Sequence, residues 1–369
     1  MNAHDPALQT LIDRVLAAQA SGTPLNICGG GSKSFYGEAA VGEPLHTGAL
    51  AGISSYEPSE LVVTARAGTP LIELETVLEE RGQCLPFEPP RFVTHMSTGA
   101  TVGGMVAAGL AGPSRASVGS VRDYVLGATL LNGRGEVLSF GGQVMKNVAG
   151  YDVSRLLAGS LGTLGVILEV SLKVLPVAPA TATLRFQLEQ VAALDKLHTW
   201  GAQPLPLNAS AWWDGTLLVR LRGALAAVQS AITTLGGDVI EPAHASPFWE
   251  GLRNQTDEYF TKAQKAVAGG SVALWRVSLP QTARPLILPG EQLIEWHGAQ
   301  RWLCTSASAA KVREAAARSG GHATLFMGEH KQAGAFAPLR SPLDRIHRDL
   351  KKSFDPTGIF NPGRLYPGL

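Results

Sequence analysis

The stretch 99–109 reads Gly-Ala-Thr-Val-Gly-Gly-Met-Val-Ala-Ala-Gly, and two more glycine-bearing stretches follow it before Pro176. The first is Gly119-Ser-Val-Arg-Asp-Tyr-Val-Leu-Gly127, and the second runs from Lys146 to Ile167 and ends Gly-Ser-Leu-Gly-Thr-Leu-Gly-Val-Ile. Because glycine lacks Cβ, the backbone at such positions can come within hydrogen-bonding distance of a large ligand, and successive N–H groups form an anion site. The pattern predicts a nucleotide-binding cradle.

An earlier glycine run lies directly after an apolar segment. Pro24-Leu-Asn-Ile-Cys28 predicts a short buried strand, and it leads into Gly29-Gly-Gly-Ser-Lys33. Backbone N–H groups of such a loop can face phosphate oxygens, while the hydroxyl of Ser32 and the ammonium of Lys33 add donors. The loop therefore predicts a pyrophosphate site.

The commoner nucleotide-binding motifs do not occur in this sequence. It contains no G-x-x-x-x-G-K-[ST], and no G-x-G-x-x-G between a strand and a helix, which argues against P-loop and Rossmann sites. Gly159-Ser-Leu-Gly-Thr-Leu-Gly165 resembles the second motif, but it precedes a predicted strand instead of a helix. The cradle must therefore belong to another fold.

Length and composition limit the functions that remain. The chain has 369 residues, of which 45% are apolar, enough for two or three domains with cores of their own. A formal charge of +1 and the lack of a basic stripe argue against nucleic-acid binding. The three cysteines, Cys28, Cys84 and Cys304, cannot provide four thiolates to an iron–sulphur cluster, so any such cluster would belong to a partner.

Neither export nor a membrane span is predicted. Met1-Asn-Ala-His-Asp-Pro6 lacks the basic and apolar regions of a signal peptide, and the most apolar stretch, 161–177, is interrupted by Glu169 and Lys173. We therefore expect a cytoplasmic protein that reaches the membrane only peripherally, through partners.

Periodicity predicts an α+β fold. Asp5-Pro6 is expected to begin a helix that ends near Gly22, and Thr69-Pro70 to cap a second helix. Asn132-Gly133 predicts a hairpin between strands at 124–131 and 136–140, and 166–175 predicts one long strand.

Three domains are expected, at 1–177, 178–334 and 335–369. Strands and helices in the second predict an α+β, ferredoxin-like cap whose core contains most of the seven tryptophans. The third is a helix from Ser341-Pro342 with Leu343, Ile346 and Leu350 on one face, which is expected to pack on the first domain.

The order of these motifs resembles the FAD-binding domain of the vanillyl-alcohol oxidase and p-cresol methylhydroxylase (PCMH) superfamily, a fold of two subdomains. The resemblance covers 1–177 and rests on the 29–33 loop, the 98–104 loop, the 119–125 segment and Gly162-Thr-Leu-Gly-Val-Ile167. Lys146-Asn-Val-Ala-Gly-Tyr-Asp152 and the tail Phe354-Asp-Pro-Thr-Gly-Ile-Phe-Asn-Pro-Gly-Arg-Leu-Tyr366 are similar to the smaller FAD-binding subunits of bacterial glycolate oxidases.

This resemblance implies a noncovalently bound FAD and a set of residues around it. The pyrophosphate would be held by Gly29, Gly30, Gly31, Ser32 and Lys33, with a second loop formed by Thr98, Thr101, Gly103 and Gly104. The flavin and ribityl chain would be contacted by Ser117 and Gly119, the ribose and adenine by Gly162, Thr163, Val166 and Ile167, and the flavin ring by the tail at Asn361.

The second domain departs from the related D-2-hydroxy-acid dehydrogenases. These carry a His-x-Gly-Asp-Gly-Asn-x-His type segment that gathers a metal ion and the substrate carboxylate. The comparable place here reads Gly320-Gly-His-Ala-Thr-Leu-Phe-Met327, which keeps one histidine, and His330 lies eight residues beyond His322. We therefore expect no metal site, and no catalytic residue is assigned.

The resemblance leaves three functions open. The chain can be one flavoprotein subunit of a glycolate oxidase, which converts glycolate to glyoxylate, beside a larger catalytic flavoprotein and an iron–sulphur subunit that takes the electrons. It can instead be an independent FAD-dependent glycolate or D-lactate dehydrogenase, with Arg364, Lys146 or Tyr151 near the substrate. The third function is a structural subunit that keeps the flavin fold without chemistry of its own.

Overall fold

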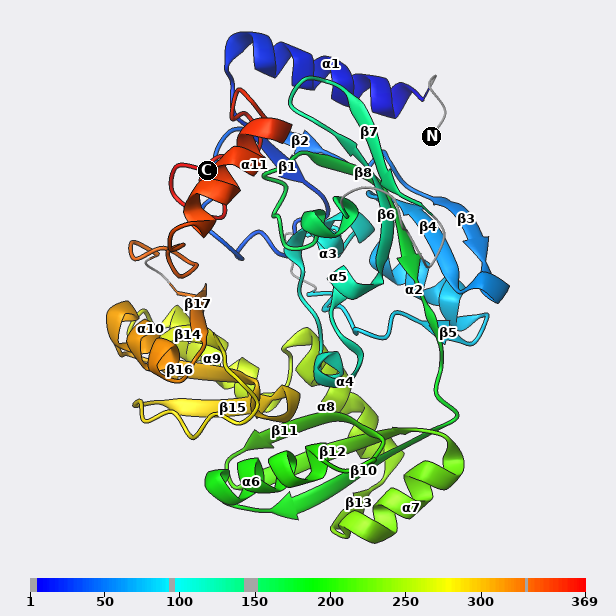
Figure 1. Ribbon diagram of the computed structural model, residues 1–369, viewed down its shortest axis with the longest axis vertical. Helices are drawn as coiled ribbons and strands as arrows, with labels where there is room; N and C mark the ends of the chain where they lie inside the picture. Colours follow the sequence, from blue (N-terminus) through cyan, green and yellow to red (C-terminus); the bar gives the residue numbers. More distant parts are fainter. Residues whose placement is uncertain (1–4, 93–96, 143–151, 329–330) are drawn as a thin grey trace. The chain divides into compact units, whose positions relative to one another are not determined.

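The computed structural model describes residues 5–92, 97–142, 152–328 and 331–369, and these form two compact units. The first unit comprises Met1–Leu110, Ser120–Pro176 and Pro338–Leu369, and the second comprises Ala111–Gly119 and Val177–Ala337. In Figure 1 the first unit therefore carries the blue elements from the start of the chain together with the red C-terminal helix. The chain leaves the first unit twice and returns to it.

Helix α1 (Pro6–Ser21) begins and ends where the sequence predicts. The Asp5 side chain accepts a hydrogen bond from the Ala7 N–H at 2.9 Å, and Gly22 closes the helix in the left-handed conformation with φ 71°. Leu8, Leu11 and Val15 are buried on one face, as the i, i+3, i+7 spacing requires.

The described residues of the first unit form three sheets. A five-stranded antiparallel sheet has the order β3-β4-β8-β6-β7, and its strands are β3 (Ile53–Glu57), β4 (Val62–Arg66), β8 (Val166–Lys173), β6 (Val125–Leu131) and β7 (Val137–Gly141). Two pairs accompany it, the parallel pair of β1 (Leu25–Cys28) with β2 (Glu43–His46) and the antiparallel pair of β5 (Gln83–Cys84) with β9 (Leu175–Pro176). The helices are α2 (Leu71–Glu79), α3 (Val102–Ala108), α5 (Val121–Tyr124) and α11 (Leu343–Phe354).

The core of the first unit joins elements that lie far apart in sequence. Its buried cluster contains Leu11 of α1, Leu25 of β1, Val166 of β8 and Phe360 from the C-terminal tail. The tail also extends β1, because the Leu25 N–H donates to the Ile359 carbonyl at 2.7 Å. The C-terminal residues are therefore part of this core.

Four local expectations for the first unit need correction. Thr69 does not cap α2, because its hydroxyl oxygen accepts from the Gly52 N–H at 3.0 Å and its proton is directed to the carbonyls of Gly52 and Arg66. The strand expected at 124–131 begins at Val125, and the helical turn α5 precedes it. The long strand at 166–175 divides into β8 and β9, which pair with different strands. The turn between β6 and β7 is longer than Asn132-Gly133, since the Asn132 N–H donates to Glu136 O at 3.0 Å.

Helix α11 differs most from its prediction. Leu343 and Ile346, expected to pack on the first domain, are each 51% exposed, and Lys351 is the residue of this helix that is buried. His347, expected to be a packed helix residue, lies edge-on to Tyr366 with ring centroids 6.0 Å apart. The helix is thus anchored through its C-terminal half.

The second unit is built on one eight-stranded antiparallel sheet with the order β13-β10-β12-β11-β15-β16-β14-β17. One half follows the βαββαβ order of a ferredoxin-like fold: β10 (Ala180–Gln187), α6 (Gln190–Gly201), β11 (Leu207–Trp213), β12 (Thr216–Gly223), α7 (Leu225–Leu235) and β13 (Asp238–Ile240). The other half has the same strand order: β14 (Ala273–Ser278), β15 (Glu291–Glu295), β16 (Gln300–Thr305), α10 (Ala309–Arg318) and β17 (His322–Met327).

The ferredoxin-like expectation was therefore correct but incomplete, because the motif occurs twice. The second copy lacks the helix between its first two strands, and a loop spans 279–290 there. Two helices that the sequence did not predict join the copies, α8 (Pro242–Asn254) and α9 (Glu258–Ala268). Five of the seven tryptophans are buried in this unit, as expected: Trp200, Trp249, Trp275, Trp296 and Trp302.

Truncating the core face of α1 should destabilise the first unit. Leu11 is 4% exposed, so Leu11→Ala leaves a cavity and should lower the free energy of unfolding by about 2–5 kcal/mol. Leu16 lies on the same helix but is 43% exposed, so Leu16→Ala should cost about 0.5 kcal/mol or less. Urea denaturation of both variants measures the difference, and equal losses would contradict the packing described.

Candidate functional site

A cleft in the first unit gathers most of the residues that the sequence predicts at the cofactor. Its wall is formed by β1 and the loop after it, by α3, by the 161–167 segment and by the C-terminal tail. The predicted residues that line it are Gly29, Gly30, Gly31, Ser32, Lys33, Thr101, Gly103, Gly104, Gly162, Ile167 and Asn361. Segments more than 300 residues apart therefore meet at one site.

The 29–33 loop lies against the 98–101 loop with almost no space between them. A Cβ added to Gly30 would come 1.7 Å from the carbonyl oxygen of Gly99, and one added to Gly29 would come 2.5 Å from Thr101 Oγ1. The Thr98 N–H donates to the Gly30 carbonyl at 3.0 Å. The first two glycines thus allow the two loops to touch, and together the loops form one edge of the cleft.

Helix α3 turns a face of small residues toward the cleft. Thr101 is its N-cap and accepts from the Gly104 N–H at 3.2 Å. A Cβ on Gly103 would come 2.6 Å from the Cβ of Ala67, whereas one on Gly104 would meet only Thr101 Oγ1 at 3.0 Å. Gly103 is therefore required by packing against Ala67, and Gly104 leaves room in the cleft.

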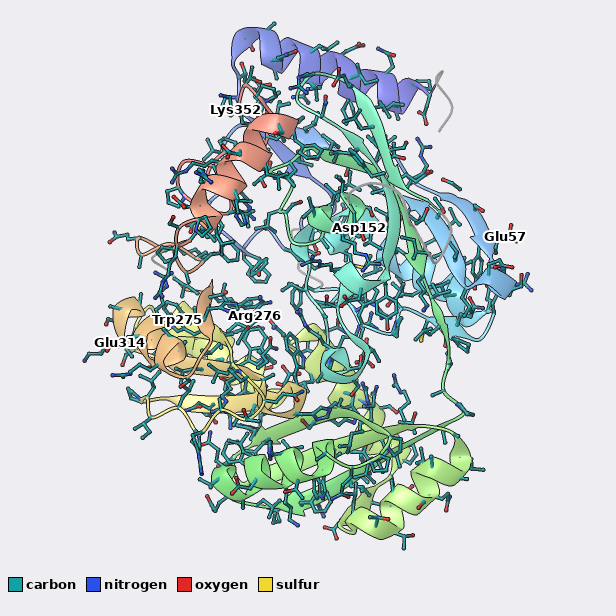
Figure 2. All side chains as sticks on the ribbon, viewed as in Figure 1. Glu57, Asp152, Trp275, Arg276, Glu314 and Lys352 are labelled. Carbon is teal, nitrogen blue, oxygen red and sulfur yellow. The ribbon has the colours of Figure 1, made fainter. Side chains whose placement is uncertain are left out.

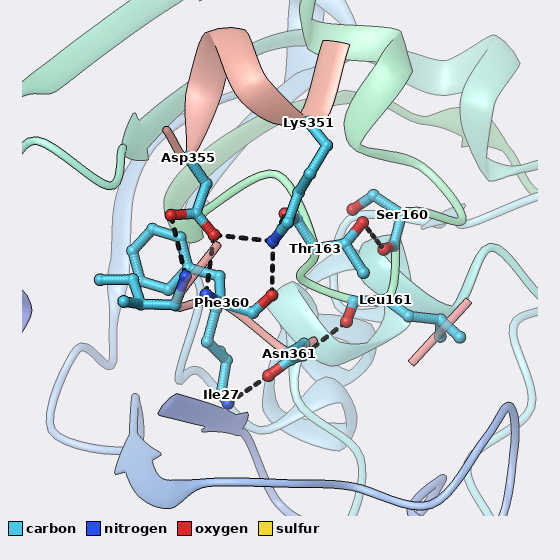
Figure 3. Close-up of polar contacts among 9 residues, drawn as sticks. Ile27, Ser160, Leu161, Thr163, Lys351, Asp355, Phe360 and Asn361 are labelled. Carbon is cyan, nitrogen blue, oxygen red and sulfur yellow. Dashed lines mark hydrogen bonds and ion pairs between the residues drawn. The ribbon is translucent and has the colours of Figure 1, made fainter. Parts of the chain in front are cut away.

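The opposite wall is a turn at 160–163 that the C-terminal tail holds in place. Asn361 Nδ2 donates to the Leu161 carbonyl at 2.6 Å, and Asn361 Oδ1 accepts from the Ile27 N–H at 2.7 Å (Figure 3). Gly162 has φ 73°, and a Cβ there would come 2.7 Å from Asn361 Nδ2. Glycine at this position permits both the turn and the approach of the tail.

The charges at the cleft suit an anionic ligand. Lys33 and Arg364 line it, and among the described residues of its wall none is Asp or Glu. The Arg364 guanidinium donates to the Ser34 carbonyl at 2.8 Å and to the Glu38 carbonyl, so it also fixes the chain beyond the glycine loop. Exposed main chain, two cations and small side chains fit the pyrophosphate of a dinucleotide.

Cys28 lines the same cleft. Burial raises the pKa of its thiol, and the charge of Arg364 opposes that shift only in part. The thiol is therefore neutral near pH 7 and a weak nucleophile.

Five predicted residues do not line the cleft. Thr98 lies behind Gly30, to which it donates a hydrogen bond. Thr163 and Val166 continue the turn at 160–163 into β8, and the side chains of these two residues are buried. Ser117 and Gly119 belong to the second unit, at the end of helix α4 (Arg115–Val118). The Ser117 hydroxyl donates there to the carbonyls of Leu207 and Asn208, at 2.7 and 2.9 Å.

Other wall residues were not predicted. Ala67, Ala107, Ala108 and Leu161 line the cleft, and on the sequence they cannot be told from ordinary core residues. Arg364, considered near a substrate carboxylate, instead lies at the glycine loop. Lys146, Tyr151 and His330 fall outside the described residues.

His322 begins β17, opposite Ser278 of β14. Figure 2 shows Trp275 and Arg276, neighbours on β14, and successive side chains of a strand point to opposite faces. Trp275 packs in the core beneath α10. Arg276 faces the other way, and burial together with its charge lowers the pKa of His322. In the part of the chain that the structure describes, no three His, Cys, Asp or Glu side chains are placed to hold a metal ion.

None of the helices described here is both long and apolar enough to span a bilayer.

A second group of polar residues lies inside the second unit, around His297. Its N–H donates to Ser210 Oγ at 3.0 Å, and its Nδ1 lies 3.1 Å from the same hydroxyl. Its Nε2 lies 3.4 Å from Ser117 Oγ, and the preceding Trp296 donates from Nε1 to the Gly112 carbonyl at 3.0 Å. These contacts attach the 111–119 segment to the rest of the second unit.

Burial lowers the pKa of His297 from 6.5 to about 4. Because the unfolded chain takes up this proton at a higher pH, the contribution of neutral His297 to stability is present above pH 6.5 and lost as the pH falls toward 4. His297→Gln should remove that loss, which is on the order of 3 kcal/mol at most. Thermal unfolding between pH 7 and 4 measures it as a shallower decline in the variant.

Exposed His198 provides the control, and His198→Gln should keep the wild-type decline. Comparison between variants is needed because Asp257 acts in the opposite direction. Burial raises the pKa of the Asp257 carboxyl to about 6. The stability contributed by its neutral form is therefore lost as the pH rises from 3.8 through 6. Parallel pH profiles for wild type and His297→Gln would contradict a buried neutral imidazole.

Comparisons with known proteins show which family this chain resembles. Residues 8–141 match the family model of an FAD binding domain. The chain is 46% identical to glycolate oxidase subunit GlcE of Escherichia coli (strain K12), over 98% of both chains.

Other similarities are partial or confined to the fold. Glycolate oxidase subunit GlcD of Bacillus subtilis (strain 168) is 28% identical over 48% of this chain and 35% of its own. A D-lactate dehydrogenase of Anaerostipes hadrus is 34% identical over 38% of this chain and 28% of its own. The solved structure of an alkyldihydroxyacetonephosphate synthase matches 96% of this chain and 74% of its own with a TM-score of 0.64 at 15% identity, which shows the shared fold.

Proposed function

The chain belongs to the family of the glycolate oxidase subunit GlcE, and from this premise we propose that it is an FAD-binding subunit of a glycolate oxidase. In this role it works beside a larger catalytic flavoprotein and an iron–sulphur subunit, and electrons from the oxidation of glycolate to glyoxylate pass through the complex. The similarity to GlcE over 98% of both chains is the observation that carries the proposal, because it includes the second unit as well as the FAD binding domain.

The cleft of the first unit is the proposed FAD site. Gly29, Gly30, Gly31, Ser32 and Lys33 would hold the pyrophosphate, with Arg364 adding a second cation at the same loop. Thr98, Thr101, Gly103, Gly104, Gly162, Thr163, Val166, Ile167 and Asn361 would complete the binding surface, and Ser117 and Gly119 remain proposed contacts of the flavin. Bound FAD accepts hydride or electrons, and the chain's own residues bind and orient it.

An independent 2-hydroxy-acid dehydrogenase is the weaker alternative. The similarity to the D-lactate dehydrogenase covers 38% of this chain, so it leaves the greater part of the chain without support. His322 is the one histidine of the metal-gathering segment that this chain retains, and the acidic, asparagine and second histidine positions are not kept. Both points favour substrate oxidation by a partner.

Filling the cleft should prevent FAD binding without unfolding the protein. Gly104 lines the cleft, and a Cβ added there would meet only Thr101 Oγ1, at 3.0 Å, so Gly104→Leu places a side chain where the cofactor would lie. We expect at least a hundredfold weaker FAD binding, measured by quenching of flavin fluorescence, with an unchanged far-UV circular dichroism spectrum. Gly48→Leu, at an exposed glycine outside the cleft with open space around it, is the matched control. Undiminished FAD binding by Gly104→Leu would place the cofactor elsewhere.

Activity assays separate the proposed subunit from an independent enzyme. The purified chain with bound FAD should reduce a dye with glycolate or D-lactate at a negligible rate, and co-expression with its companion subunits should restore the reaction with glycolate. Rapid bleaching of the flavin in the isolated chain would support the independent dehydrogenase. A colourless chain that binds no FAD, alone or with its companions, would overturn the FAD-binding role.

A further inference from the structure

The segment 351–361, here called the C-terminal strap, joins the end of α11 to the cleft. The Lys351 ammonium donates to three oxygens: Thr163 O at 2.8 Å, Asp355 Oδ2 at 2.7 Å and Phe360 O at 2.6 Å (Figure 3). The side chains of Lys351 and Asp355 are only 9% and 0% exposed. A buried lysine with all three donors occupied is unusual, and its partners lie on two separate segments of the chain.

Asp355 shapes the turn that brings the strap back toward β1. Its carboxylate accepts from the N–H groups of Ile359 and Phe360, at 3.1 and 2.8 Å, in addition to Lys351. Burial lowers the pKa of Lys351, and the Asp355 carboxylate opposes that shift. The ammonium and the carboxylate lie 2.7 Å apart, so their opposite charges compensate one another within the strap.

The strap holds the 160–163 turn at two points. Lys351 binds the carbonyl of Thr163, and Asn361 binds the carbonyl of Leu161 while it accepts from the Ile27 N–H of β1. Leu161 and Gly162 line the cleft between these two points, but Lys351 and Asp355 do not. The ion pair thus contacts a wall of the cleft from outside, through the carbonyl of Thr163.

We propose that Lys351 and Asp355 are positioning residues of the nucleotide site, which fix the 160–163 turn against β1 and thereby set the affinity for FAD. The inference rests on the proposed FAD site, to which it adds residues outside the wall. Because coupling between two sites is reciprocal, bound FAD in turn stabilises the strap. The glycine loop alone does not determine how tightly the cofactor is held.

The test removes the ion pair without leaving a single buried charge. Removing one partner of a buried pair is strongly destabilising, so both are changed together, Lys351→Met with Asp355→Asn. We expect at least a tenfold increase in the FAD dissociation constant. In protein without FAD, hydrogen exchange of the amides in 157–165 should become at least tenfold faster.

The control is a second ion pair in the same unit, with side chains that are 22% and 18% exposed. Asp5 also caps backbone N–H groups and pairs with a cation, Arg66, and neither residue lines the cleft. Arg66→Met with Asp5→Asn should leave both the FAD affinity and exchange in 157–165 as in wild type. If the strap variant does not fold, Lys351→Arg, which keeps the positive charge but not the geometry of the three donors, should show the same two changes.

The two measurements distinguish the possible failures. Faster exchange with unchanged FAD affinity, or weaker FAD binding with unchanged exchange, would overturn the positioning role. An equal effect of the Asp5 and Arg66 control would overturn it too, since general destabilisation would then explain both changes. If wild type binds no FAD the proposed function falls, while the exchange experiment still decides whether the ion pair holds the turn.

Discussion

The first unit depends on close contacts at glycines, where any side chain would collide with a neighbouring segment. At Gly30 an added Cβ would overlap the carbonyl of Gly99, and at Gly162 it would displace the Asn361 amide. A third case is Gly103, which lies against Ala67. These glycines are required by the protein's own packing, and the cleft is the space that this packing leaves between the loops.

Much of the first unit could be predicted, because its signals are local. The glycine loops, the capped helix α1 and the β6–β7 hairpin follow from a few adjacent residues each. The walls contributed by Ala107 and Leu161 could not be predicted, since alanine and leucine at such positions are also typical of a core. The placement of Ser117 in the second unit depends on contacts with Leu207 and Asn208, about 90 residues away in sequence.

Helix α11 and the second unit show the limits of periodicity. The amphipathic pattern of α11 predicted burial of Leu343 and Ile346, but both are exposed. Lys351 is buried instead, because its ammonium has three hydrogen-bond acceptors. In the second unit the ferredoxin-like type was predicted, but the order of its strands depends on pairing between distant segments. The loop at 279–290 replaces a helix there, contains Pro280, Pro285 and Pro289, and is held by the fully buried Arg301 through the carbonyls of Ala283 and Arg284.

The hydrogen bond between Ile27 and Asn361 spans 334 residues of sequence. Closing so long a loop carries a large entropic cost, and chains dominated by such contacts fold slowly. A ribosome releases the whole second unit before it releases the strap. A nascent first unit therefore lacks the contacts of the strap with β1 and the 160–163 turn until the second unit has been made.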